Sequence, residues 1–454
     1  MTASDLRFEG SYVLEPDQVY LPGTGFRAGV AVAVAGGVFT DVGPAAEVRS
    51  RRPDAPVARL EGLVLLPGFV DAHHHLSQAL GSTLAYGEPS EIFRRIWLPL
   101  EQALTPEELG VSARLAALES LRGGFITVVD AGTRSAHDVE LMVEQTEDAG
   151  LRCVIGKTCA DIPPGSPPAR EVLRAAEQHL DRFAGRPLVH PSLAVPVPEV
   201  ATPEVLVQVS KLSAAAGCVW QSHVNEHLAS VERSILETGR RPLEYLDCLG
   251  ILDAALLAAH VTLITPAEAL LLAQAGTAVS YNPVASSWKG NAVAPALLLA
   301  DLGVRVGLGT DGTRGDGFRL MDAAETAQRF ATAMTVGDPF GGGGRRWLDA
   351  ATEGGARAAG LGDVTGSIEA GKSADFLLVD TRVPDLVPSF DLAWELVRVG
   401  NRDQLRAVVT AGTTRLVDGW PVGWDGRELL GRASRHARAA IERAGLSLRP
   451  WADR

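Results

Sequence analysis

Short apolar runs alternate with helix-period segments along most of this chain. Between residue 67 and about residue 370, residues 106–122, 136–149, 169–183 and 203–216 have apolar positions at helical spacing. The runs between them are apolar and β-branched, which is typical of buried strands. Eight strands with intervening helices predict an α/β fold of the (β/α)₈ barrel type. The expected strands start at Leu63, Ile126, Cys153, Leu188, Cys218, Leu256, Ala278 and Val304.

The two ends of the chain have a different pattern. The first 66 residues contain short alternating runs such as 30–34 and 38–42, and strand-like runs return at 374–379 and 405–416. Two β segments that flank a barrel predict one small, discontinuous β-sandwich domain. The expected divisions are 1–66 and 371–424 for the two parts of the β domain, 67–370 for the barrel, and 425–454 for a C-terminal helical tail.

Composition limits the class of protein. The chain has 454 residues, 46% of them hydrophobic, and a formal net charge of −13. An acidic balance disfavours nucleic acid as a partner, because that binding depends on basic surfaces. The four cysteines form no C-x-x-C pair, and no stretch is apolar for long enough to cross a membrane. The polar N-terminal residues do not resemble a secretory signal, so none is expected. We expect a soluble cytoplasmic protein with free thiols and no membrane partner.

Two histidines follow the first expected barrel strand. His73 and His75 lie in the segment Pro67-Gly68-Phe69-Val70-Asp71-Ala72-His73-His74-His75. Side chains repeat every two residues along a strand, so His73 and His75 share one side and His74 faces away. Two adjacent imidazoles at a strand end form half of a site for a divalent metal ion.

Three further expected strands end in residues of the same chemistry. His223 ends the strand that starts at Cys218, and Glu226 follows it by three residues. His260 and Asp311 end the strands that start at Leu256 and Val304. In a (β/α)₈ barrel the reactive side chains lie at the carboxyl ends of the strands, so these residues are expected to converge at one rim.

These residue types fit metal-dependent hydrolysis. Three imidazoles and a carboxylate suit zinc, or iron or manganese, and leave one position for water. Such a metal lowers the pKa of the bound water toward neutrality. Glu226 is expected to transfer protons without binding the metal, and His260 to orient the hydroxide or stabilise developing charge. Asp311 is expected to act both as a ligand and as a base.

The chain resembles the amidohydrolase superfamily, in the branch of chlorohydrolases and N-heteroaromatic deaminases. That branch includes S-adenosylhomocysteine/methylthioadenosine deaminases, oxidised-guanine deaminases and triazine hydrolases. The resemblance implies that His73, His75, His223 and Asp311 are metal ligands, that Glu226 is the proton shuttle, and that His260 orients water or substrate. The motifs that carry it are Pro67-Gly68-Phe69-Val70-Asp71-Ala72-His73-His74-His75, His223-Val224-Asn225-Glu226, Ala259-His260, Gly307-Leu308-Gly309-Thr310-Asp311-Gly312 and residues 366–375.

The resemblance also bears on the number of metal ions and subunits. Members with two metals carry a carboxylated lysine at the end of the fourth strand, and residues 188–195 contain no lysine. Lys157 lies on the third strand instead. We therefore expect one divalent metal ion per chain, Zn²⁺ before Fe²⁺ or Mn²⁺. Relatives are usually dimers or larger, which implies a homodimer or a larger homo-oligomer.

The candidate substrate-binding residues are Gln78, Trp97, Tyr281 and Asn282. Tyr281 stands where relatives often have histidine, in a segment that lines the pocket rim in the family. Gln78 lies in a segment similar to oxidised-guanine deaminases, where it is expected either to bond a heterocycle or to cap the following helix. Trp97 is expected either to stack on a flat ring or to pack beneath a loop.

The resulting expectation is a metal-dependent aminohydrolase that releases ammonia from an amino-substituted N-heteroaromatic ring, with an aminopurine or nucleoside favoured. Purine, pterin, pyrimidine and triazine rings all fit that description. The first alternative is a hydrolase that removes chloride or an alkylamine from such a ring, or opens a cyclic amide. The second is an inactive relative that acts in binding or assembly.

Overall fold

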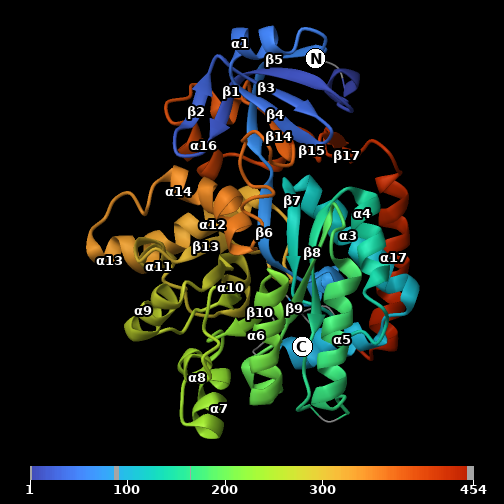
Figure 1. Ribbon diagram of the computed structural model, residues 1–454, viewed down its shortest axis with the longest axis vertical. Coiled ribbons are helices and arrows are strands. Elements are labelled where there is room, and N and C mark those ends of the chain that lie inside the picture. The colour runs from blue at the N-terminus through green and yellow to red at the C-terminus, as the bar shows by residue number, and fades with distance from the viewer. Residues whose placement is uncertain (1–2, 86–91, 164, 447–454) are drawn as a thin grey trace, which may run out of the picture.

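The computed structural model describes residues 3–85, 92–163 and 165–446. Its strands form two sheets, one of eight strands and one of nine. The nine-stranded sheet lies at one end of the molecule, and the eight-stranded sheet lies among the helices of the larger part (Figure 1). In the nine-stranded sheet, strands from the N-terminal part of the chain lie beside strands from its C-terminal quarter.

The larger part is the expected parallel barrel. Its strands follow one another in chain order around the sheet, and each neighbouring pair is parallel. Most of their residues are buried, which explains the nearly continuous apolar runs in the sequence. The barrel strands are β6 (Phe69–His74), β7 (Phe125–Asp130), β8 (Arg152–Thr158), β9 (Val189–Ala194), β10 (Trp220–Val224), β11 (Leu256–His260), β12 (Ala278–Tyr281) and β13 (Arg305–Leu308).

Helices cover the outside of the barrel. Three of them, α3, α5 and α6, have the predicted bounds, and Thr105 and Thr202 cap the first and third with side-chain hydrogen bonds. The helices are α1 (Ala45–Arg51), α2 (Leu98–Ala103), α3 (Pro106–Arg122), α4 (Glu140–Ala149), α5 (Ala169–Phe183), α6 (Pro203–Ala216), α7 (Leu228–Thr238), α8 (Pro242–Cys248), α9 (Pro266–Ala275), α10 (Pro283–Lys289), α11 (Ala296–Asp301), α12 (Gly317–Gln328), α13 (Met334–Val336), α14 (Gly344–Asp349), α15 (Gly355–Ala358), α16 (Leu392–Arg398) and α17 (Gly426–Arg443).

The second sheet confirms the discontinuous β unit. Strand β14 pairs antiparallel with β5, so segments from both ends of the chain meet in the middle of the sheet. The order is β17-β16-β15-β14-β5-β1-β3-β4, and β2 pairs with β1. The strands are β1 (Tyr12–Leu21), β2 (Gly25–Ala28), β3 (Val30–Ala35), β4 (Val38–Pro44), β5 (Val57–Pro67), β14 (Phe376–Asp380), β15 (Leu405–Thr410), β16 (Thr413–Val417) and β17 (Trp420–Pro421).

The predicted first barrel strand proves to be two strands. Strand β5 ends at Pro67 in the β unit, and β6 begins at Phe69 in the barrel. Gly68 joins them at a point where an added Cβ would lie only 2.1 Å from Ile126 Cγ1. The apolar run gave no sign of this crossing, because residues on either side of it are buried in one sheet or the other. The predicted domain limits stay a prediction, which these sheet memberships support.

A buried ion pair connects the barrel with the β unit. Arg152, on β8, and Asp375, beside β14, form this junction pair, with Nη2 3.0 Å from Oδ2. Asp375 also accepts hydrogen bonds from the Thr365 and Ser373 hydroxyls and from the Ala411 amide. Both carboxylate oxygens are therefore satisfied, as a buried charge requires.

Two further predictions concern cysteines and membranes. All four cysteines are free; Cys153 and Cys159 are buried and Cys248 is exposed. Among the described residues, none of the helices combines the length and the apolar character needed to cross a bilayer.

Candidate active site

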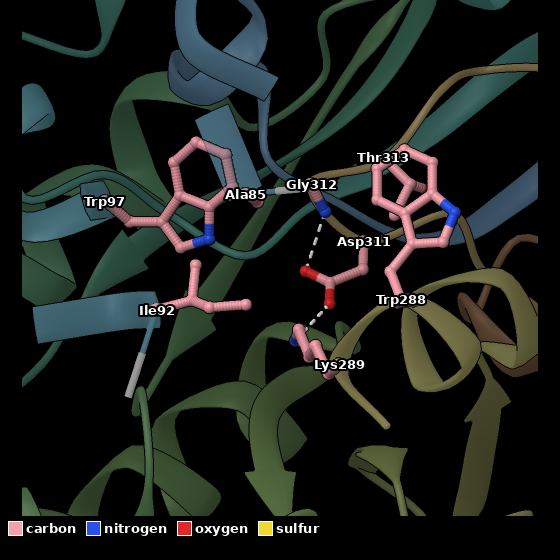
Figure 2. A pocket seen from close by; sticks show the side chains of 9 residues that line it. Ala85, Ile92, Trp97, Trp288, Lys289, Asp311, Gly312 and Thr313 are labelled. Atoms are coloured by element: carbon pink, nitrogen blue, oxygen red, sulfur yellow. Dashed lines mark hydrogen bonds and ion pairs between the residues drawn. The ribbon is translucent and has the colours of Figure 1, made fainter. Parts of the chain in front are cut away.

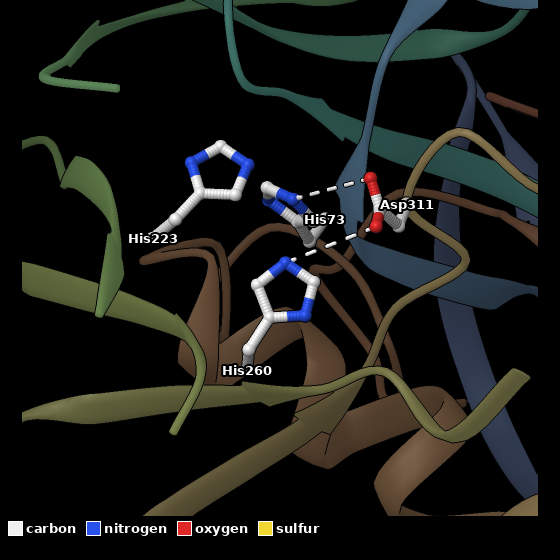
Figure 3. Close-up of side chains that lie close together, drawn as sticks. All are labelled: His73, His223, His260 and Asp311. Atoms are coloured by element: carbon white, nitrogen blue, oxygen red, sulfur yellow. Dashed lines mark ion pairs between the residues drawn. The ribbon is translucent and has the colours of Figure 1, made fainter. Parts of the chain in front are cut away.

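The barrel strand ends bring four of the predicted residues together. His73 lies on β6, His223 on β10 and His260 at the end of β11, and Asp311 follows β13 by three residues. One ligand atom from each lies within 4.8 Å of those from the others. Their side chains point toward a common centre (Figure 3). We call these four residues the rim cluster.

His75 lies beside the rim cluster, just beyond the end of β6. Its Nε2 is 3.3 Å from Asp311 Oδ1 and 3.4 Å from His223 Nε2. The structure therefore brings together all five predicted histidine and aspartate side chains, although the compact four-residue group contains His260 rather than His75.

The imidazoles have nitrogen atoms without partners. His73 Nε2, His75 Nδ1 and His260 Nε2 are buried and have no hydrogen bond among the described residues. Buried polar atoms are normally paired, so this group is incomplete by itself. Burial, helped by neighbouring imidazoles, holds the pKa of His73 and of His223 well below the ordinary value. The neutral rings of His73 and His223, each with a nitrogen lone pair toward the centre, fit a divalent metal ion.

The orientation of His223 is set from outside the centre. Its Nδ1 is 2.7 Å from the carbonyl oxygen of Pro196, so Nδ1 carries the proton and donates it there. The lone pair of Nε2 then faces the centre. A backbone carbonyl that holds the second ring nitrogen is a common support for a metal-binding histidine.

His260 is held in the opposite tautomer. The Ser280 hydroxyl donates to Asn282 Oδ1 at 2.7 Å, which fixes the amide so that Nδ2 faces His260 Nδ1 at 3.2 Å. His260 Nδ1 accepts that hydrogen bond, so in the neutral ring Nε2 carries the proton. That N–H lies 3.7 Å from Glu226 Oε2 and 3.8 Å from Asp311 Oδ2. His260 is thus arranged as a donor toward the centre.

Glu226 lies on the other side of His260, next to a lysine that sequence reasoning missed. Lys289 Nζ donates to Glu226 Oε1 at 2.7 Å and to Asp311 Oδ2 at 2.6 Å. Burial opposes ionisation of Glu226, but His260 and Lys289 outweigh it and hold its pKa well below the ordinary value. Glu226 is therefore a carboxylate whose Oε1 is bonded and whose Oε2 is directed at the centre.

Lys289 ends α10, the helix that follows β12. Burial disfavours its charge, yet the carboxylates of Asp311 and Glu226 outweigh burial and raise its pKa. One signal could have identified it. The chain has only four lysines among 42 basic residues, and this one follows directly on the strand-end segment that departs from the family pattern.

A small pocket opens beside Asp311. Trp97 and Trp288 lie on either side of that carboxylate, and Ile92 and Lys289 lie below them in the view (Figure 2). The remaining lining residues are small or short: Ala85, Ala285, Gly312 and Thr313. Two indoles with one carboxylate between them form a slot suited to a flat ring.

The other predicted substrate residues do not line this pocket. Gln78 is buried, and its Nε2 donates to Glu101 Oε1 at 3.0 Å. Tyr281 is buried in the core, and its hydroxyl accepts a hydrogen bond of 3.1 Å from Gln328 on α12. Asn282 contacts His260 rather than the pocket. Of the four predicted residues, only Trp97 lines the pocket directly.

The chain belongs to the amidohydrolase family, whose model matches residues 64–415. It is 30% identical, over 89% of its length and 91% of the relative, to a 5-methylthioadenosine/S-adenosylhomocysteine deaminase from Syntrophobacter fumaroxidans. A protein of the same name from Haloarcula marismortui is also 30% identical, over 97% of this chain and the whole of the relative. The chain is therefore a hydrolase of the amidohydrolase family.

Solved structures share the fold. An adenosine deaminase from Xanthomonas campestris with bound zinc has a TM-score of 0.87 and 28% identity, covering 95% of this chain and 99% of that one. An atrazine chlorohydrolase from Arthrobacter aurescens, complexed with zinc, has a TM-score of 0.83 and 20% identity, covering 94% and 100%. The second likeness supports the fold alone. The zinc bound in the adenosine deaminase structure agrees with a site built of imidazoles and a carboxylate.

Proposed function

We propose that this protein is a metal-dependent aminohydrolase that removes ammonia from an amino-substituted purine or a related N-heteroaromatic ring. The observation that carries the proposal is the buried group of partnerless imidazole nitrogens around Asp311, with the Glu226 carboxylate beside it and a slot between two indoles in front. The names of the curated relatives and of the zinc-bound neighbour favour a purine nucleoside within this class.

In this proposal His73, His75, His223 and Asp311 hold one divalent metal ion, with zinc favoured over iron or manganese. The protonated Nε2 of His260 excludes it from the ligand set, because a nitrogen that carries a proton has no lone pair for a metal. The bound metal supplies a water molecule whose pKa is lowered toward neutrality. His260 donates a hydrogen bond to the oxygen that attacks the ring and stabilises its developing charge.

Glu226 is the proposed proton carrier. Lys289 and Asn291 bind its Oε1 at 2.7 and 3.4 Å, so its Oε2 remains available to substrate. Water supplies the oxygen that replaces the exocyclic nitrogen on a ring carbon, and Glu226 passes one of the water's protons to the ring nitrogen and the other to the departing amine. The carbon–nitrogen bond breaks, and the amine leaves as ammonia.

The pocket walls hold the ring flat. Trp97 is nearly fully buried and therefore fixed, while Trp288 is partly exposed and lies on α10 directly before Lys289. Stacking between two indoles places a ring carbon next to Asp311 without reading the ring's substituents. This arrangement selects flat rings, and the substituents are selected elsewhere in the pocket.

A second leaving group is the main alternative. The same centre is suited to removing chloride or an alkylamine from a heteroaromatic ring, or to opening a cyclic amide. Glu226 favours an amine, because an amine needs a proton to leave and chloride does not. An inactive binding relative is disfavoured by the complete donor set.

Two finer expectations remain proposals. We infer a homodimer or a larger homo-oligomer from the resemblance to relatives. We infer a cytoplasmic location without nucleic-acid partners from the acidic charge and the cysteine usage.

The test is ammonia release by protein of known metal content. The panel contains adenosine, 5′-methylthioadenosine, S-adenosylhomocysteine, guanine and an aminotriazine, with 6-chloropurine riboside and N6-methyladenosine as matched probes for chloride and alkylamine. We expect ammonia from at least one purine, in proportion to metal up to about one ion per chain. Turnover of the matched probes alone would contradict deamination and favour the alternative leaving groups.

A further inference from the structure

One boundary between barrel strands lacks the hydrogen-bonded ladder that joins the other neighbouring strands. Strands β13 and β6 lie at the two ends of the strand order, and no ladder joins them within the described residues. A single isolated bridge, between His74 and Asp311, links them. We call this boundary the seam. Glycines let its two sides approach closely: an added Cβ would lie 2.9 Å from Ala72 Cβ at Gly307, on β13, and 2.9 Å from His73 Cβ at Gly309.

One buried carboxylate spans the seam. Asp71, on β6, is fully buried, and its Oδ1 accepts hydrogen bonds from the Thr310 amide at 2.9 Å and the His73 amide at 3.2 Å. Its Oδ2 accepts from the Thr310 hydroxyl and lies 3.2 Å from His74 Nδ1. Thr310 directly precedes Asp311. The Asp71 carboxylate therefore binds the backbone of His73 and the backbone of the residue next to Asp311.

The neighbouring side chains complete this network. The only proton of the Thr310 hydroxyl is donated to Asp71, so that hydroxyl accepts from His74 Nδ1, which lies 2.8 Å away. This gives His74, which faces away from the centre, a structural place at the seam. The backbone of Asp311 is also held: its amide donates to the His73 carbonyl at 2.8 Å, and its φ of +59° is one that few non-glycine residues adopt.

We propose that Asp71 is a positioning residue: it closes the seam and sets the distance between the metal-binding side chains on its two sides. His73 and His75 lie on the β6 side and Asp311 on the β13 side, so a metal ion bound by them would cross the same boundary as Asp71. The inference rests on the proposed metal site. It adds that metal affinity depends on hydrogen bonds made beneath the site, at a residue that touches neither metal nor substrate.

The first test is metal binding by the full-length Asp71→Asn protein. Asparagine has nearly the same shape as aspartate, but its NH2 group cannot accept a hydrogen bond. It would face the donor groups of Thr310 or His74 and leave them without an acceptor. We expect Co²⁺, measured by chelator competition, to bind about 10- to 100-fold more weakly, the range usual for loss of a residue that supports a ligand. The visible absorption bands of bound Co²⁺ should also change, because they report ligand geometry. Wild-type affinity and an unchanged spectrum would overturn the proposal.

Asp375→Asn is the matched control. Asp375 is equally buried and also accepts backbone and hydroxyl hydrogen bonds, but it lies at the junction with the β unit. We expect its Co²⁺ affinity to stay within about threefold of wild type. An equal loss in both variants would mean that general destabilisation, not positioning at the seam, weakens metal binding.

Hydrogen exchange tests the seam itself. Peptides covering 69–76 and 305–312 should exchange faster in metal-free Asp71→Asn than in metal-free wild type, and added Zn²⁺ should restore much of the protection. Exchange in other barrel strands should stay unchanged. Equal exchange at the seam in the two metal-free proteins would contradict the proposal.

Thr310→Val is the second variant, to be used if Asp71→Asn does not fold. It also shows whether a hydrogen bond of Asp71, rather than its negative charge, supports metal binding. It removes one hydrogen bond to Asp71 and keeps the carboxylate. We expect a smaller loss of Co²⁺ affinity in the same direction, and no loss at all would overturn the positioning role. Wild-type protein that binds no divalent metal would instead refute the proposed function on which this inference rests.

Discussion

Two buried groups of charged and polar residues lie at different parts of the barrel, and they differ in how completely they are satisfied. At the junction pair, every oxygen of Asp375 has two donors within the protein. In the rim cluster, imidazole nitrogens are buried without partners. Although Arg152 Nε is buried without a hydrogen bond, the junction pair neutralises its own charges and serves stability. The rim cluster instead gathers several unpartnered imidazole nitrogens at one point, which suits a bound ion. Substitutions in the two groups should therefore fail in different ways.

Asp311→Asn should have the largest effect. The substitution removes a charged ligand, so turnover should fall by at least about 10⁴-fold, because loss of the metal costs several kcal/mol of transition-state stabilisation. Metal content and kcat, measured on the same folded sample, check this. Normal turnover with normal metal content would remove Asp311 from the metal site.

Glu226→Gln should leave the metal in place and slow the chemistry. Loss of a proton carrier usually costs about 10²- to 10⁴-fold in rate. Ammonia release should fall within that range while metal content stays near the wild-type value. A loss of metal equal to that of Asp311→Asn would show instead that Glu226 is a ligand.

Asp375→Asn should show the reverse pattern. Breaking a buried ion pair typically lowers the free energy of unfolding by about 3 to 5 kcal/mol, because the remaining charge is left without its partner. Arg152 would be that charge. Denaturant unfolding should show the loss, while kcat per folded molecule stays unchanged. A normal stability with a reduced kcat would contradict the comparison.

His179→Gln should have the smallest effect, and one confined to acid pH. Burial lowers the pKa of His179 from 6.5 to about 4, against a hydrogen bond to the Ile155 carbonyl that opposes the shift. Below pH 6.5 the unfolded chain takes up a proton that the folded chain excludes, so stability falls as pH falls toward 4. The full contribution is at most about 3 kcal/mol.

Glutamine keeps a donor for that carbonyl and does not titrate. The unfolding free energy of His179→Gln should therefore vary less between pH 6.5 and 4 than that of wild type. His436→Gln, on the more exposed surface of α17, is the control and should follow the wild-type curve. An identical pH dependence in all three proteins would rule out His179 as a source of acid sensitivity.

Much of the barrel site could be predicted because, in this fold, reactive side chains lie at the carboxyl ends of the strands. His73, His223, His260 and Asp311 were each found by asking which side chain ends a strand, and their convergence needs no knowledge of the loops. The bounds of α3, α5 and α6 followed from helical periodicity; α3 and α6 begin at a proline, and Pro168 directly precedes α5.

The remainder depends on contacts that sequence spacing does not encode. Lys289 reaches Glu226 and Asp311 from the last position of α10, and Asn282 faces His260 because Ser280 fixes its amide. The break at Gly68 depends on which sheet each side of the run joins. None of these features has a period or motif of its own, so the contacts they make are visible only in the folded chain.

The central pairing of β5 with β14 has a consequence for synthesis. On the ribosome, β5 emerges roughly 300 residues before its partner. At about 5 to 20 residues per second, one edge of that strand stays uncovered for roughly fifteen seconds to a minute. This edge includes the apolar run Leu63–Leu66, the kind of segment that pairs with other chains when exposed. The nascent protein therefore cannot protect this edge of β5 until β14 has been synthesised and has paired with it.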